Sequence, residues 1–165
     1  MAIITEDQIE KAIISVFVNN LGYRHLNCFD VDTTERDCET DVMIKPLLKR
    51  KLKELNPQLS EEVIEEAFKE ICNTRFDKSD IHANREIYSL LKDGVQLTIN
   101  NADGRKEPVS VKVIDFKDES KNDYLVTSQL WIKGDLRLRP DLIVFINGLP
   151  LLFIELKNSN VPVRN

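Results

Sequence analysis

The stretch RPDLIVFINGLPLLFIELK, residues 139–157, contains two apolar runs separated by Asn147-Gly148. Asn-Gly between two hydrophobic segments is a strong short-range signal of a β-hairpin, because both residues adopt positive φ readily. The near absence of polar residues in the runs predicts strands that are buried on both faces, in the middle of a sheet. Three charged residues stand toward the open end of this hairpin, and they are Asp141, Glu155 and Lys157.

The register of the hairpin decides whether these three charges share one face. Glu155 and Lys157 are two residues apart, so they share a face of a regular strand. A two-residue loop would pair Asp141 with Ile154 and place it on the opposite face. A three-residue loop, or a β-bulge, would bring Asp141 to the face of Glu155. A catalytic role for all three residues therefore predicts an odd-length loop or a bulge.

Convergence of the three side chains would point to phosphodiester chemistry. Two neighbouring carboxylates repel each other unless a cation lies between them, and two such oxygen ligands with waters suit Mg²⁺. The cation polarises a phosphoryl oxygen and lowers the pKa of a water, while a nearby lysine stabilises developing negative charge. The alternative is that Glu155 and Lys157 are solvated charges at a strand end, because [DE]-x-K is a weak pattern.

The rest of the chain places helices before strands, which favours an α/β (α+β) domain with a mixed sheet flanked by helices. A capping box of Thr5 and Gln8 opens the first helix, and Gly22 ends it. Residues 24–40 are polar and aperiodic, which predicts a loop. Helices are expected at 5–22, at 46–55, from Ser60 to about 71 and at 82–92, and further strands at 95–99, 109–116 and 124–132.

Composition indicates a globular cytoplasmic protein of one domain. The 165 residues are 42% hydrophobic and 31% charged, and the net charge of −5 argues against a general nucleic-acid binder. The acidic excess is local, because residues 1–44 hold nine acidic and three basic residues, whereas residues 133–165 hold three and five. No apolar run is long enough to cross a membrane. Three scattered cysteines and two histidines predict neither a disulfide framework nor a zinc site.

Several basic residues are candidates for contacts with DNA phosphates. The most basic patch is Lys49-Arg50-Lys51, and it is either a solvated helix face or a phosphate-contacting one. Arg137 and Arg139 also suit phosphate contacts, although Arg139 could instead pair with Asp135. We interpret the nearby polar and aromatic residues as core or sheet surface, and these are Tyr124, Gln129 and Trp131.

RPDLIVFINGLPLLFIELKNS resembles the PD-(D/E)xK motif as it occurs in the R (restriction) subunit of type I restriction-modification enzymes. Other segments resemble the same family in order along the chain, so the similarity covers nearly its whole length. These segments are TEDQIEKAIISVFVNNLGY, LKELNPQLSEEVIEEAFKEI, NREIYSLLKDGVQLTI and VKVIDFKDESKNDYLVTSQLWI. The long form NGLPLLFIELK is far more specific than the spacing of the three charges alone.

The resemblance implies a restriction-endonuclease-like core and a Mg²⁺-dependent endonuclease that cuts double-stranded DNA. Asp141 and Glu155 match the metal-binding carboxylates, the Leu156 carbonyl matches a further metal ligand, and Lys157 matches the catalytic lysine. A glutamate of the first helix often points into such sites. The candidates here are Glu6 and Glu10, one turn apart on one face, although each could instead be a solvated helix charge. Arg139 before the Pro-Asp pair also fits the family motif.

The resemblance also implies what lies outside this sequence. The family carries a Gln-x-x-x-Tyr motif after the lysine strand and an ATP-driven translocase, and neither pattern occurs here. We therefore expect residues 1–165 to be a single nuclease domain, the N-terminal piece of a longer subunit, with ATP bound only by the full-length subunit. Specificity (S) and methyltransferase (M) subunits are the implied partners. The alternatives are a free-standing repair or junction nuclease and a non-catalytic docking domain.

Overall fold

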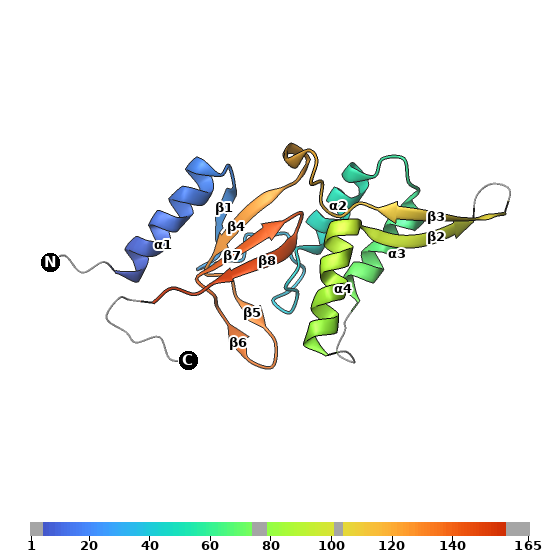
Figure 1. Ribbon diagram of the computed structural model, residues 1–165. Helices are drawn as coiled ribbons and strands as arrows, with labels where there is room; N and C mark the ends of the chain where they lie inside the picture. The colour runs from blue at the N-terminus through green and yellow to red at the C-terminus, as the bar shows by residue number, and fades with distance from the viewer. Residues whose placement is uncertain (1–4, 74–78, 101–103, 158–165) are drawn as a thin grey trace. The chain divides into compact units, whose positions relative to one another are not determined.

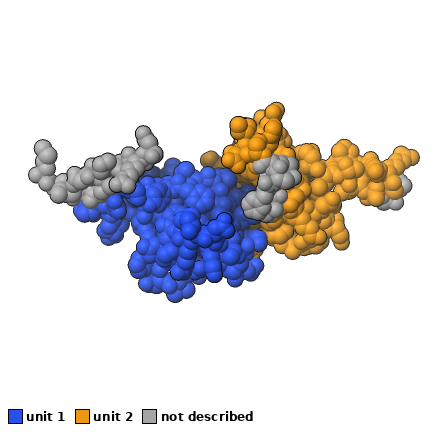
Figure 2. Space-filling view, turned by 90° about the horizontal axis from the view of Figure 1, so that it is seen from below, with its two compact units in different colours: residues 1–45, 123–165 blue, residues 46–122 orange. Residues whose placement is uncertain are grey.

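The computed structural model describes residues 5–73, 79–100 and 104–157. The chain divides into two compact units, residues 1–45 with 123–165 and residues 46–122 (Figure 2). The helices are α1 (Glu6–Ser15), α2 (Lys45–Leu55), α3 (Glu61–Cys72) and α4 (Asp80–Asp93), with a π-helical turn η1 (Val16–Asn20) and a 3₁₀ helix η2 (Glu119–Lys121) (Figure 1). The strands are β1 (Arg24–Asn27), β2 (Val95–Asn100), β3 (Lys106–Val111), β4 (Tyr124–Ser128), β5 (Ile132–Lys133), β6 (Arg137–Leu138), β7 (Leu142–Ile146) and β8 (Leu149–Ile154).

The first unit is built on a four-stranded mixed sheet in the order β1-β4-β7-β8. β1 runs parallel to β4, whereas β4 with β7 and β7 with β8 are antiparallel. Val126, Leu142 and Val144 form a buried cluster on this sheet, and residues of α1 and η1 pack against it, namely Ile13, Ile14 and Phe17. The α+β class with a mixed sheet and a flanking helix is therefore confirmed.

The start of α1 follows its sequence signal. The Thr5 hydroxyl accepts a hydrogen bond from the Gln8 backbone N–H at 3.3 Å, and the Gln8 side chain accepts one from the Thr5 N–H at 3.0 Å. This reciprocal pair is the predicted capping box, which satisfies two otherwise unpaired N–H groups of the first turn. The helical path ends at Gly22, whose φ of +74° is a conformation that glycine adopts without strain.

Two predictions about strands were wrong. The stretch 24–40 is not all loop, because β1 forms within it by pairing with β4, although its sequence RHLN has no apolar alternation. β8 is not buried on both faces, because it stands at the edge of the described sheet with β7 as its neighbour. Leu151, Leu152 and Phe153 are consequently 41%, 49% and 50% exposed, whereas β7 is almost fully buried.

Two strands are shorter than their apolar patterns predicted. β3 ends at Val111 instead of continuing to residue 116. β4 ends at Ser128, because Gln129 adopts a φ of +57° that takes the backbone out of the extended conformation. The chain then forms a separate two-stranded ribbon of β5 and β6 before it enters β7. The left-handed turn at Gln129 therefore lies immediately beside the end of the sheet that carries Asp141.

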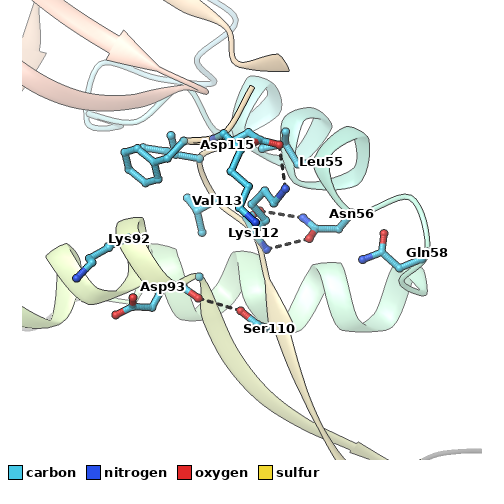
Figure 3. A pocket seen from close by; sticks show the side chains of 13 residues that line it. Leu55, Asn56, Gln58, Lys92, Asp93, Ser110, Lys112, Val113 and Asp115 are labelled. Atoms are coloured by element: carbon cyan, nitrogen blue, oxygen red, sulfur yellow. Dashed lines mark hydrogen bonds and ion pairs between the residues drawn. The ribbon is translucent and has the colours of Figure 1, made fainter. Parts of the chain in front are cut away.

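The second unit combines α2, α3 and α4 with the β2–β3 hairpin (Figure 1). Its core consists of apolar residues at helical spacing on α2 and α3 and at alternate positions of the hairpin, such as Leu48, Leu52, Ile64, Val95 and Val111. The Asn56 side chain, only 2% exposed, exchanges two hydrogen bonds of 2.8 Å with the backbone of Lys112 (Figure 3). This buried amide joins the C-terminal end of α2 to the chain that follows β3.

Candidate active site

The β7–β8 hairpin contains the bulge that a shared site for the three charges requires. Asn147 and Gly148, with φ of +53° and +83°, form a two-residue turn, and Ile146 pairs with Leu149. One residue further along, the partner shifts, because Phe145 pairs with Pro150 and Val144 pairs with Leu152. Leu151 is therefore the extra residue of a β-bulge.

The bulge decides which residue faces Asp141. After the bulge, Leu142 pairs with Ile154 at the end of the two strands. Extending this register by one residue brings Asp141 opposite Glu155. Directly opposed residues of antiparallel strands have their side chains on the same face. Without the bulge, the two-residue turn would have paired Asp141 with Ile154. The prediction of an odd-length loop or a bulge is thus confirmed, and the device used is the bulge.

Both carboxylate oxygens of Asp141 accept hydrogen bonds. Oδ2 accepts one from the Leu156 backbone N–H at 2.6 Å, and Oδ1 accepts one from Nε2 of Gln129 at 3.3 Å. The Asp141 carbonyl oxygen also accepts the Gln129 backbone N–H at 3.0 Å. Asp141 is therefore held between the end of β4 and the Glu155–Lys157 segment, with its carboxylate orientation defined by two donors.

Glu155 and Lys157 form an exposed ion pair next to this carboxylate. Nζ of Lys157 lies 2.9 Å from Oε1 of Glu155, and the side chains are 50% and 60% exposed. The hydrogen bond that Lys157 donates to Glu155 raises the pKa of Lys157, and the charges of Glu155, Glu6 and Asp141 act in the same direction. An exposed ion pair contributes little to stability, so Lys157 can exchange Glu155 for an anionic substrate at small cost.

The first helix contributes acidic side chains to the same region. Oε2 of Glu10 accepts a hydrogen bond of 2.7 Å from Nε2 of Gln129, the amide that also contacts Asp141. Glu6, one turn earlier, acts electrostatically on Lys157. Both candidate glutamates of α1 therefore lie on the side of the helix that faces Asp141 and Lys157.

Three polar residues near the site were not predicted to belong to it. Gln129 lies between Glu10 and Asp141, although its position after an apolar strand suggested core or sheet surface. Nε2 of His25 lies 3.0 Å from Oγ of Ser128, at the parallel β1–β4 junction. Partial burial lowers the pKa of His25, and the nearby Glu10 charge opposes that shift. The available signal was the polar pair Ser128-Gln129 at the end of an apolar strand.

The donor set at the site suits Mg²⁺. Among the residues that the structure describes, no group of three or more His, Cys, Asp or Glu side chains is arranged to hold a metal ion. A cation here would therefore take two carboxylates, from Asp141 and Glu155, together with the Leu156 carbonyl and waters. Hard oxygen ligands and retained water are what Mg²⁺ prefers, and soft ligands are not among these groups. The chemistry of these oxygen ligands is compatible with Mg²⁺, whose binding here stays a prediction.

Two of the predicted phosphate-binding arginines lie close to Asp141 in sequence. The Arg137 guanidinium stacks on the Trp131 ring at 4.0 Å and pairs with Glu39 at 2.8 Å. Arg139 lies over both Phe29 and Trp131, at 5.0 Å from each ring centre, and does not pair with Asp135. Both guanidinium groups thus stack on Trp131, and Arg137 is also engaged with Glu39.

The remaining predicted phosphate contacts are on α2, in the second unit. Lys49 forms an ion pair with Glu65, and Lys51 forms one with Glu54 at 2.7 Å. Arg50, between them, is exposed. These ion pairs show that acidic neighbours on α2 and α3 already offset part of this basic patch.

The second unit also contains a surface pocket of about 500 Å³ (Figure 3). Its lining includes Lys92, Lys112 and Lys117 with Asp93 and Asp115. The Lys112 ammonium pairs with the Asp115 carboxylate at 2.8 Å and, with the backbone N–H groups of residues 118 and 117, lowers the pKa of Asp115 to about 2. Lys112 and Asp115 are thus engaged with each other, and Lys92 lies over the Tyr88 ring at 5.8 Å.

The mixed sheet with its flanking helix is consistent with a restriction-endonuclease-like core. Residues 3–165 match the family described as type I restriction enzyme R protein N terminus, and the chain belongs to this family. In the described residues, no helix combines the length and the apolar character needed to cross a membrane.

The chain is similar to subunits of restriction enzymes from distant organisms. It is 33% identical over 163 residues to the putative type I restriction enzyme MjaIXP endonuclease subunit of Methanocaldococcus jannaschii. It is 31% identical over 163 residues to the type I restriction enzyme HindI endonuclease subunit of Haemophilus influenzae. Each alignment covers 94% of this chain but only 15% of the relative. The chain thus spans about one seventh of the length of these relatives.

Proposed function

We propose that this domain hydrolyses phosphodiester bonds of double-stranded DNA with Mg²⁺, as the nuclease of a type I restriction complex. The observation that supports the proposal is the bulge at Leu151. Extended by one residue, the register after the bulge brings Asp141 opposite Glu155, which lies two residues before Lys157. Asp141 accepts the Leu156 N–H and Glu155 pairs with Lys157, so both carboxylates lie at the same end of the edge strand. A divalent cation bound there would offset the repulsion between two such acidic groups.

Each residue has a distinct role in the proposal. Asp141, Glu155 and the Leu156 carbonyl would hold Mg²⁺, which when bound would polarise the phosphate and acidify a water molecule. The Lys157 ammonium would donate a hydrogen bond to a phosphoryl oxygen and stabilise the negative charge that develops there. Glu10 would orient water at the edge of the site.

We assign DNA binding to basic residues of both units. Arg137 and Arg139 would contact phosphates next to the scissile bond, and Lys49, Arg50 and Lys51 would contact phosphates elsewhere on the duplex. Such contacts position the DNA without reading its sequence. We therefore assign site recognition to a specificity subunit and methylation to a methyltransferase subunit, with ATP hydrolysis in the part of the subunit that lies outside this domain.

Cleavage by the assembled restriction complex tests the catalytic assignment. Asp141→Ala and Lys157→Ala should each lower the rate of DNA cleavage by at least about 10²-fold, because each removes a charge that acts on the transition state. Asp7→Ala and Lys121→Ala are matched controls, since Asp7 forms an exposed ion pair with Lys11 and Lys121 forms one with Asp118. Unchanged cleavage by the two site variants would instead indicate a docking domain.

Metal binding is measured separately on the 165-residue chain. Calorimetric titration with Mg²⁺ or Mn²⁺ should show a site in the wild type that Glu155→Ala weakens. Glu119→Ala serves as the matched control, because Glu119 is an exposed residue at the start of η2. Identical isotherms for the wild type and Glu155→Ala would contradict this metal site.

A further inference from the structure

The Gln129 side chain is a neutral bridge between two carboxylates from distant parts of the chain. Its Nε2 donates to Oε2 of Glu10 at 2.7 Å and to Oδ1 of Asp141 at 3.3 Å. Glu10 is 119 residues away in sequence, so the contact exists only because α1 packs against the end of the sheet. The single amide nitrogen thus uses both of its protons on carboxylate acceptors.

The backbone at Gln129 is adapted to this position. Its φ of +57° lies in the left-handed region, which non-glycine residues rarely adopt and which concentrates at functional sites. The backbone N–H donates to the Asp141 carbonyl at 3.0 Å, so main chain and side chain contact the same aspartate. The fold therefore keeps Gln129 in a rarely adopted backbone conformation, and in this conformation its side-chain amide contacts the Asp141 carboxylate.

A neutral amide donor between Glu10 and Asp141 leaves the negative charge of both carboxylates in place, which a lysine or arginine would not. Two facing carboxylates are most simply stabilised by lysine or arginine, but a positive charge there would cancel the field that attracts a metal ion. An amide lowers the cost of bringing the carboxylates together and leaves their negative charge in place. With Leu156 N–H on Oδ2, it also defines the plane of the Asp141 carboxylate before a cation arrives.

We propose that Gln129 is a positioning residue that orients Asp141 for the divalent cation and links it to Glu10. This inference rests on the proposed function, because it presumes that Asp141 binds the cation. Residues that orient metal ligands typically change metal affinity by about 10- to 100-fold when they are replaced. The role is distinct from that of the carboxylates, since Gln129 acts through Asp141.

Mn²⁺ titration of the 165-residue chain by calorimetry and by electron paramagnetic resonance tests the inference. Gln129→Leu keeps the size of the side chain but cannot donate, and it should weaken Mn²⁺ binding about 10- to 100-fold. Gln129→Lys keeps a donor but adds a positive charge, and it should also weaken binding while leaving the unfolding midpoint unchanged or raised. Gln96→Leu is the matched control, because the Gln96 amide donates only to groups of residues 93, 94 and 110.

The outcomes separate this inference from the proposed function. Wild-type binding that Asp141→Ala abolishes supports the metal site, and weaker binding by folded Gln129→Leu then supports the positioning role. If Gln129→Leu or Gln129→Lys binds Mn²⁺ as the wild type does, the positioning role is overturned and the metal site stands. If the wild type does not bind Mn²⁺, both the metal site and the role of Gln129 are overturned. Circular dichroism shows whether each variant is folded.

Discussion

Deletion of Leu151 should leave the candidate site intact, although the residue lies at the centre of the motif. After the deletion, the pair Val144–Leu152 follows directly on the pair Phe145–Pro150, so the hairpin has no bulge. The register beyond this point does not change, and Asp141 therefore stays opposite Glu155. Leu151 is 41% exposed, and full burial of a leucine contributes about 1.5–3 kcal/mol. The free energy of unfolding should therefore fall by only about 1 kcal/mol.

Insertion of one threonine between Leu152 and Phe153 should have the opposite effect. It moves Glu155 by one residue, about 3.3 Å along the strand, and to the other face of the sheet. The 2.6 Å hydrogen bond between Oδ2 of Asp141 and the Leu156 N–H cannot survive such a shift. A misplacement of 1 Å can already cost about 10²-fold in rate, so cleavage should fall by at least that factor and Mg²⁺ binding should be lost.

The assay compares both variants with the wild type. DNA cleavage is measured in the assembled complex, Mg²⁺ binding is measured by calorimetry, and urea unfolding confirms that each variant folds. The register argument predicts that the shorter hairpin works and the longer one fails. A folded Leu151 deletion that neither binds Mg²⁺ nor cleaves DNA, or an insertion variant with normal cleavage, would refute it.

Three further predictions concern the second unit. Asn56→Ala should lower the free energy of unfolding by about 1–3 kcal/mol in urea titrations, because it removes the partner of the Lys112 N–H and C=O in two part-buried hydrogen bonds; an unchanged free energy would contradict this. Gly94→Ala should lower the melting temperature, because φ is +80° and a Cβ would lie 2.6 Å from the Val111 carbonyl oxygen; an unchanged melting temperature would show that the turn relaxes. The pKa of Asp115 is lowered from 3.8 to about 2 in the folded state, so its contribution to stability is complete above about pH 5 and is lost as the pH falls toward 2. Asp115→Asn should therefore make the urea unfolding midpoint depend less steeply on pH between pH 5 and pH 2. An equally steep pH dependence in the variant and the wild type would contradict this prediction.

Local signals in the sequence were sufficient for the helices and for the turn of the hairpin. Thr5 and Gln8 specify the start of α1, and the spacing of apolar residues specifies α2 and α3. Asn147-Gly148 specifies the position of the turn but left its length open between two and three residues. Each of these signals acts between residues a few positions apart, so the sequence alone contains it. The sequence of residues 141–157 also predicted the chemical groups of the candidate site, which are two carboxylates and a lysine.

Tertiary structure alone decided how those charges meet. The bulge at Leu151 has no sequence signature in an apolar strand, and it depends on how β8 pairs with β7. β1 is a strand only because β4 provides its hydrogen-bond partners, and Gln129 meets Glu10 only because α1 packs on the sheet. The residue types at the site follow from local sequence, whereas their arrangement follows from contacts between segments that are far apart in the chain, and only the fold brings such segments together.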